Sequence, residues 1–159
     1  FNEEDLKDEN LKCEAMLYNS LLGGSANSKL FQNVREKASL AYTASSSYVR
    51  YKSNIFINAG IEIENFDKAL DIIRKQIEDL KNGDFTQEQI DNEKKGIISQ
   101  INTIDDEQDT EIIYFLGQEL TDTNETIDQY KENISKVTKE QIQNVASKVE
   151  INTIYFLRN

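Results

Sequence analysis

The sequence predicts an α+β fold, with a mostly antiparallel sheet and helices packed on one face. Segments with helical periodicity are grouped along the chain, and so are segments with the two-residue alternation of strands. Two alternating segments follow each other across a short connection, which indicates an antiparallel hairpin. Because helices and strands are grouped rather than alternating, this order favours α+β over a doubly wound α/β sheet. The 159 residues suffice for one domain with a core.

The first elements are helical. Residues 4–22 are expected to form a helix, because their apolar side chains recur three and four positions apart. The pair Gly23 and Gly24 is typical of a helix that ends in a left-handed residue. Ser28 is the expected N-cap of a second, short helix over residues 28–34.

Three segments have the pattern of strands. Residues 40–48 alternate and are rich in aromatic and small side chains, and residues 55–63 alternate after a turn at 52–54. Gly60 in the second strand suggests a bulge or a close backbone approach. Residues 151–157 alternate again and predict a last strand.

Helical periodicity occupies the region between the second and the last strand. Helices are expected over residues 65–80, 86–104, 111–120, 126–134 and 138–149. Gly83 is the expected stop of the first of them. Thr86 with Gln89, and Thr138 with Gln141, have the spacing of capping boxes.

Composition excludes several classes of partner. There are 18 basic and 29 acidic residues, a net charge of −11, so nucleic acid and anionic membranes are not expected partners. No apolar stretch reaches the roughly 20 residues that span a bilayer, and no signal-peptide pattern is present. We therefore expect a cytoplasmic protein. Cys13 is alone and lies in an apolar helical run, so it is expected to be a buried small hydrophobe.

The chain begins at Phe1 rather than at methionine. We therefore expect residues 1–159 to be a single domain excerpted from a longer protein. A strand upstream of Phe1 would fit this expectation, because three strands make a thin sheet for this length.

Histidine is absent, which decides much of the chemistry. Serine and cysteine triads that need a histidine base are excluded, and so are zinc sites built on histidine or on clustered cysteines. We expect no catalytic residue and no metal ligand in this chain. Residues 23–29 superficially resemble a phosphate loop, but they follow a helix and lack the required spacing.

Two groups of carboxylates are candidate sites. Calcium ligands could come from the acidic loop, but its spacing is not that of an ion-wrapping loop, and a solvated connection is favoured. The acidic loop consists of Asp105, Asp106, Glu107 and Asp109. Glu62 and Glu64 share a strand face, yet nothing distinguishes an acid from a base, and a solvent-facing strand edge is favoured.

The stretch from Leu22 to Tyr48 carries a family pattern. It reads LGGSANSKLFQNVREKASLAYTASSSY, with the elements L-G-G, S-K-L-F, R-E and L-A-Y at fixed spacing. It resembles the pitrilysin/insulinase family of inverted zinc peptidases, and in particular its non-catalytic C-terminal domain. The later helices and the last strand also occur in family order. Lys29 departs from the pattern, because arginine is commoner there.

The resemblance implies a processing-peptidase/LuxS-like metallohydrolase fold and a chamber built from two halves. One half carries H-x-x-E-H and zinc, whereas the other supplies an arginine and a tyrosine that hold the substrate. That pair maps onto Arg35 and Tyr42, and Gly23 and Gly24 are weaker candidates for a substrate-side loop.

Purely structural interpretations of the same residues stay open. Arg35 could make a surface ion pair with Glu36 or Glu14, Tyr42 could be a core aromatic, and the two glycines could only end a helix.

Two functional hypotheses follow from the resemblance. The chain is the substrate-binding, zinc-free half of a zinc endopeptidase that cleaves peptides or unfolded chains in a closed chamber. Its partners are then a zinc-bearing catalytic domain or subunit and a peptide substrate, and it is not catalytic alone. Alternatively, it is a scaffold or partner subunit of the same family with no proteolysis. A stand-alone α+β binding domain is a third interpretation.

Overall fold

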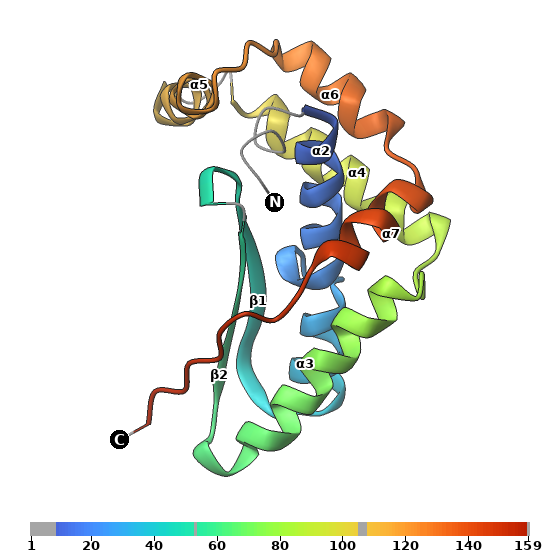
Figure 1. Ribbon diagram of the computed structural model, residues 1–159, viewed down its shortest axis with the longest axis vertical. Helices are drawn as coiled ribbons and strands as arrows, with labels where there is room; N and C mark the ends of the chain where they lie inside the picture. The colour runs from blue at the N-terminus through green and yellow to red at the C-terminus, as the bar shows by residue number, and fades with distance from the viewer. Residues whose placement is uncertain (1–8, 53, 105–107, 159) are drawn as a thin grey trace.

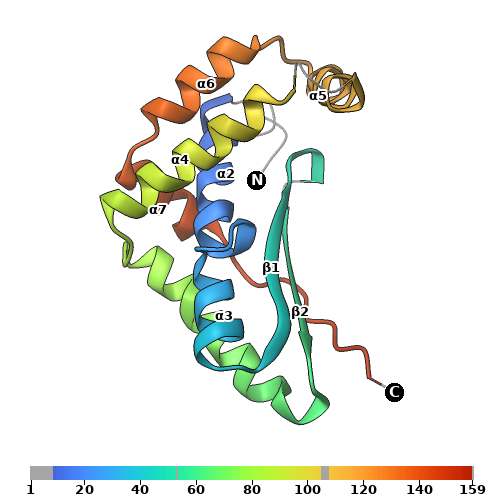
Figure 2. The same ribbon diagram turned by 180° about the vertical axis from the view of Figure 1, so that it is seen from behind.

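The structure is a computed structural model, and it describes residues 9–52, 54–104 and 108–158. A β-hairpin forms one side of the molecule and the long helices form the other, as the two opposite views of Figures 1 and 2 show. The start of the predicted 4–22 helix lies outside the described residues. So do Asp105, Asp106 and Glu107 of the acidic loop.

The first helical segment ends at the glycine pair where a stop was predicted. Helix α2 spans Glu9–Asn19, and a π-helical turn, η1, continues through Ser20–Gly24. The left-handed conformation predicted for this stop is wrong, because among the described glycines only Gly83 has a positive φ. Gly23 has another role, a close approach to a strand, which is described below.

The second helical segment is a π-helix, η2, over Phe31–Lys37. The chain enters it after Ser28, as predicted, and Leu30 and Val34 are buried. The capping role of Ser28 is wrong, because its buried hydroxyl makes no hydrogen bond among the described residues.

The predicted hairpin is confirmed. Strands β1 (Ala41–Val49) and β2 (Asn54–Ile61) pair antiparallel, and a short 3-10 turn, η3 (Arg50–Lys52), leads out of β1. Ala41 pairs with Ile61 but Thr43 pairs with Gly60, so β1 contains one extra residue, Tyr42. This is a β-bulge opposite Gly60, where sequence reasoning expected an irregularity.

The bulge changes the face on which Tyr42 lies. Further along β1, Ala44 and Ser46 are buried under the helices, whereas Ser45 and Ser47 are exposed. Unbroken alternation would place Tyr42 with Ala44 on the covered face. Because of the extra residue, Tyr42 is exposed instead.

Helices follow the hairpin in the predicted order. After a short 3-10 turn, η4 (Ile63–Asn65), they are α3 (Phe66–Lys81), α4 (Gln87–Asn102), α5 (Gln108–Thr121), α6 (Ile127–Lys136) and α7 (Lys139–Lys148). Gly83 has φ of 74° and ends α3 as predicted. Both predicted capping boxes are present, and Thr126 with Gln129 forms another at the start of α6.

The predicted last strand is wrong. Residues 149–158 are described, but they have no regular secondary structure. A strand needs a neighbour for its backbone hydrogen bonds, and the sheet described here consists of β1 and β2 alone. The segment is fixed in part by Phe156, whose ring stacks on Phe66 with centroids 4.2 Å apart.

The core lies between the inner face of the hairpin and the helices. Its largest fully buried apolar side chains are Tyr18, Leu17, Leu22, Leu30, Leu80, Ile90, Ile134 and Ile142. Cys13 is fully buried, as predicted. None of the described helices is long and apolar enough to cross a membrane.

Candidate functional site

Arg35 lies in η2 with its side chain 44% exposed. Its guanidinium lies over the ring of Phe31, 4.6 Å from the centroid, and its Nε is 3.6 Å from the Glu36 carboxylate. This surface ion pair with Glu36 is the structural alternative to a substrate role that the sequence left open. An exposed pair of this kind is weak, about 0–1 kcal/mol, so it leaves the guanidinium available to another acceptor.

Tyr42 lies on the bulge of β1 and is 70% exposed. Its hydroxyl donates a hydrogen bond to the Glu62 carboxylate, just beyond the end of β2. That hydrogen bond, and the negative charge behind it, raise the pKa of the Tyr42 phenol. The phenol therefore remains a neutral donor over a wider pH range, and the core-aromatic interpretation of Tyr42 is wrong.

A short connection joins the helix of Arg35 to the strand of Tyr42. The Ser39 N–H donates to the Arg35 carbonyl at 3.1 Å, and the Leu40 N–H donates to the Val34 carbonyl at 3.1 Å. Ser39 has φ of 52°, a left-handed conformation that closes the turn. Strand β1 thus starts soon after η2 ends, so Arg35 and Tyr42 are separated by only this short turn. That Arg35 and Tyr42 hold one substrate stays a prediction.

The two glycines have different surroundings. A Cβ on Gly23 would lie 2.5 Å from the Ser46 backbone nitrogen, so only glycine lets η1 pack against β1. Gly24 instead lines a cavity. A packing role therefore explains Gly23, and a substrate-side role for either glycine stays a prediction.

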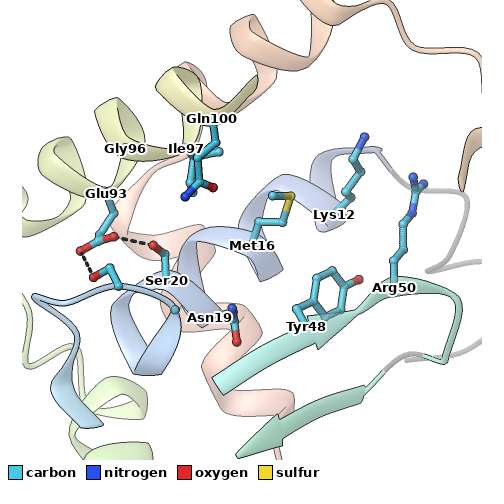
Figure 3. Close-up of a pocket in the computed structure, with 12 residues that line it drawn as sticks. Lys12, Met16, Asn19, Ser20, Tyr48, Arg50, Glu93, Gly96, Ile97 and Gln100 are labelled. Atoms are coloured by element: carbon cyan, nitrogen blue, oxygen red, sulfur yellow. Dashed lines mark hydrogen bonds between the residues drawn. The ribbon is translucent and has the colours of Figure 1, made fainter. Parts of the chain in front are cut away.

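The cavity has a volume of about 290 Å³ and lies between α2, α4 and the end of β1 (Figure 3). Glu93 stands at one end of it, and Lys12 and Arg50 stand at the other. Neither Arg35 nor Tyr42 lines it.

Glu93 is a buried carboxylate that the sequence reasoning missed. It accepts hydrogen bonds from the hydroxyls of Ser20 and Ser25, the latter at 2.8 Å, and so connects η1 to α4. A signal was available, because Glu93 stands between Ile90 and Ile97 on the apolar face of its helix. A charged residue on such a face is buried only with partners.

A second missed cluster surrounds Lys12. This buried ammonium pairs with Glu125 and lies 3.8 Å from the ring centroid of Tyr130. Asn133 donates to the other oxygen of Glu125 at 2.7 Å. Burial is the main cause that raises the pKa of Tyr130, so this ring stays neutral beside the ion pair. The cluster joins α2 to α6 and has a structural role.

The residues do not fit a zinc site. The chain contains no histidine, and the described residues include no group of three or more cysteine, aspartate or glutamate side chains that could hold a metal ion. Cys13 is the one thiol, and it is buried. The described residues therefore lack the histidine and clustered cysteine ligands that are typical of zinc sites.

Comparison with known proteins supports the resemblance seen in the sequence. The family described as the peptidase M16 inactive domain matches residues 3–97, more than half of the chain. The chain belongs to this family. The predicted membership in a zinc-metallopeptidase family, through its non-catalytic domain, is thereby confirmed.

Relatives of this M16 inactive domain agree in sequence and in fold. It is 40% identical over 144 residues to the "Probable inactive metalloprotease YmfF" of Bacillus subtilis, matching 89% of this chain and 33% of the relative. A conserved protein of Enterococcus faecalis has a TM-score of 0.82 at 29% identity, over 90% of this chain and 34% of that one.

A peptidase M16 inactive domain from Pseudomonas fluorescens shares the fold, with a TM-score of 0.75 at 23% identity. The matched region covers 92% of this chain and 35% of the Pseudomonas fluorescens chain. The predicted α+β fold is confirmed, and the chain spans about a third of the length of these relatives.

Proposed function

We propose that this chain is the substrate-holding, zinc-free domain of a zinc-dependent endopeptidase. It forms one wall of a closed chamber in which peptides or unfolded chains are cleaved. The zinc belongs to a catalytic domain or subunit of the same family, which forms the other wall. The chain is not catalytic alone.

The observation that carries the proposal is the bulge at Tyr42. An extra residue in β1 turns a tyrosine outward that unbroken alternation would bury, and bulges of this kind often re-aim side chains next to active sites. The phenol then offers a neutral donor on the open side of the hairpin. A donor aimed at a developing oxyanion contributes about 2.7–4 kcal/mol to transition-state stabilisation.

Arg35 supplies the second group. Its guanidinium has several donors in a rigid fork, which suits a peptide carbonyl or a substrate carboxylate. It is exposed, and within the described residues its side chain contacts the Glu36 carboxylate and the Phe31 ring. Exchanging the Glu36 contact for a substrate oxygen therefore costs little.

The donor set of this chain supports placing the zinc elsewhere. The relatives extend about twice its length beyond the matched third, which leaves room for a metal-bearing half. In this arrangement Arg35 and Tyr42 bind and orient the peptide, and the zinc-bearing half supplies the metal as Lewis acid.

The test uses the full-length protein. Arg35→Ala and Tyr42→Phe are each expected to lower kcat/KM for an unfolded-peptide substrate by at least about tenfold, with the zinc content unchanged. Arg74→Ala and Tyr155→Phe are matched controls, because both residues are exposed and lie on other elements. Equal kinetics for all four variants would refute the roles of Arg35 and Tyr42.

A second candidate function is a scaffold or partner subunit without proteolysis. The relative with 40% identity bears a name that calls it inactive. Zinc analysis of the full-length protein separates the two candidates. About one zinc per protein with peptide hydrolysis supports the enzyme, whereas zinc-free protein that binds peptide without cleaving it supports the scaffold.

A further inference from the structure

Helix α5 carries apolar side chains that the described part of the chain leaves exposed. Five of them, which we call the α5 stripe, are between 52% and 70% exposed. The α5 stripe consists of Ile112, Ile113, Phe115, Leu116 and Leu120. Single exposed apolar residues are ordinary, but five on one short helix mark an interaction surface.

The opposite edge of α5 is firmly attached, so the orientation of the stripe is fixed. The Tyr114 hydroxyl and the Gln118 amide both donate to the Glu125 carbonyl, at 2.9 and 2.8 Å. The Tyr114 ring also stacks on Tyr130, with centroids 5.9 Å apart. Because Tyr114 and Gln118 bind the body of the molecule, the stripe faces away from it.

The stripe lies beside the turn end of the hairpin. In Figures 1 and 2, α5 is next to η3, and the C-terminal segment ends at the opposite end of the molecule. Phe56 of β2, which lies near this turn, is also exposed. A stable interface takes about 800 Å² from each partner, more than one stripe supplies, and Phe56 and the turn extend the available surface.

Charge argues against a second copy of this chain as the occupant. Helix α5 contains Asp109, Glu111 and Glu119 and no basic residue, and the net charge of the chain is −11. Two copies would bring acidic rims together, which is unfavourable. The expected partner therefore has an apolar groove with a basic rim.

We infer that the α5 stripe docks against the zinc-bearing half of the peptidase. This inference rests on the proposed function for the identity of that half. The chain spans only about a third of the length of its relatives, so a large covalent or separate partner is available to cover the face. The stripe then joins the two halves beside the chamber, while the bulge with Tyr42 remains open to substrate.

Thiol labelling in the full-length protein, or in the complex if the halves are separate, tests the inference. Leu116→Cys places a thiol in the stripe, and Asp128→Cys is the control, because the Asp128 side chain is 98% exposed on α6. The native Cys13 is buried and stays unreactive in folded protein, and any cysteine outside residues 1–159 is replaced by serine. Ile113→Cys serves as a second variant if Leu116→Cys reduces the yield of folded protein.

The thiol at position 116 is expected to react with a maleimide at least about tenfold more slowly than the thiol at 128, at every protein concentration and without peptide. Equal rates would overturn the inference, because the face would be open. Protection that is lost on dilution would assign the face to a second copy, and protection that needs added peptide would assign it to the substrate.

Hydrolysis by the same preparations separates this inference from the proposed function. If Tyr42→Phe leaves hydrolysis unchanged while the thiol at 116 is protected, the substrate role fails and the docking surface stands. If hydrolysis depends on Tyr42 but the thiol at 116 reacts quickly, the substrate role stands and the docking surface fails.

Discussion

The β-hairpin has a covered side and an open side, and the two sides are built from different side chains. On the covered side, Ala44 and Ser46 are buried against α2 and η1. On the open side, Thr43, Ser45 and Ser47 are exposed. The same strand therefore packs the core with one set of residues and presents polar groups with the other.

The comparison of the two sides shows how a register shift in β1 changes the side on which Tyr42 lies. Tyr42 has the spacing of the covered side but the exposure of the open side, because the bulge inserts it between two paired positions. Substitutions on the covered side should therefore change stability, and substitutions on the open side should change substrate handling alone.

The largest effect is expected from Lys12 in the helical layer behind the covered side. Lys12→Met removes the cation of a buried ion pair with Glu125, so the free energy of unfolding should fall by about 3–5 kcal/mol. Denaturant titration measures this loss. Lys75→Met is the control, because its pair with Asp79 lies at the surface and should change stability by less than about 1 kcal/mol.

The double variant Lys12→Met with Glu125→Gln tests the cause. Removing the buried charge of Glu125 as well should restore part of the stability. A double variant no more stable than Lys12→Met would show that packing, rather than the buried carboxylate, accounts for the loss.

A smaller effect is expected at the contact between η1 and β1. Gly23→Ala places a Cβ 2.5 Å from the Ser46 nitrogen, and this overpacking should cost about 1–3 kcal/mol. Gly96→Ala is the matched control, because nothing lies within 4 Å of its Cβ position. Alanine should stabilise that position in α4 by up to about 1 kcal/mol. Equal denaturation midpoints for the two variants would contradict the close contact.

On the open side, Tyr42→Phe should leave stability almost unchanged. The phenol is exposed and its hydrogen bond to Glu62 lies in solvent, so the free energy of unfolding should stay within about 0.5 kcal/mol. Thermal and denaturant melts measure it. A loss comparable to that of Gly23→Ala would mean that Tyr42 belongs to the packed side.

The smallest effect is a change in the titration of Tyr42. Glu62 raises the pKa of the phenol, so Glu62→Gln should lower this pKa toward its ordinary value. A raised pKa stabilises the protonated donor, and that stabilisation is lost as the pH rises through the pKa of the folded protein. The variant should therefore lose the alkaline end of its activity profile at a lower pH than the parent. Identical alkaline limbs would contradict the role of Glu62.

Local sequence patterns predicted the elements that depend on local interactions. Capping boxes at Thr86 and Thr138, the stop at Gly83 and the hairpin all have their determinants within a few residues. The predicted strand at 151–157 failed because a strand also needs a partner, which periodicity cannot supply. Gly23 was misassigned because its glycine requirement comes from a distant strand, not from its own backbone.

The site was predicted only in part. The family spacing predicts a substrate role for Arg35 and Tyr42, which stays a prediction, and the structure places both side chains at the surface. Gly60 predicted an irregularity in the hairpin, but not that Tyr42 would be the extra residue, because register shifts arise from cross-strand pairing. Glu93 and Lys12 were overlooked, although a charged residue on an apolar helix face was the available signal.

The most direct test of the open side is to observe the Tyr42 phenol while peptide binds. In full-length protein labelled at the tyrosine Cζ, and depleted of zinc so that peptide is not cleaved, the resonance missing from Tyr42→Phe identifies this residue. Saturating peptide should shift that resonance, as the hydroxyl exchanges Glu62 for a peptide carbonyl, and should leave buried Tyr130 unchanged. An unmoved Tyr42 resonance in a peptide-saturated protein would contradict the substrate-holding role.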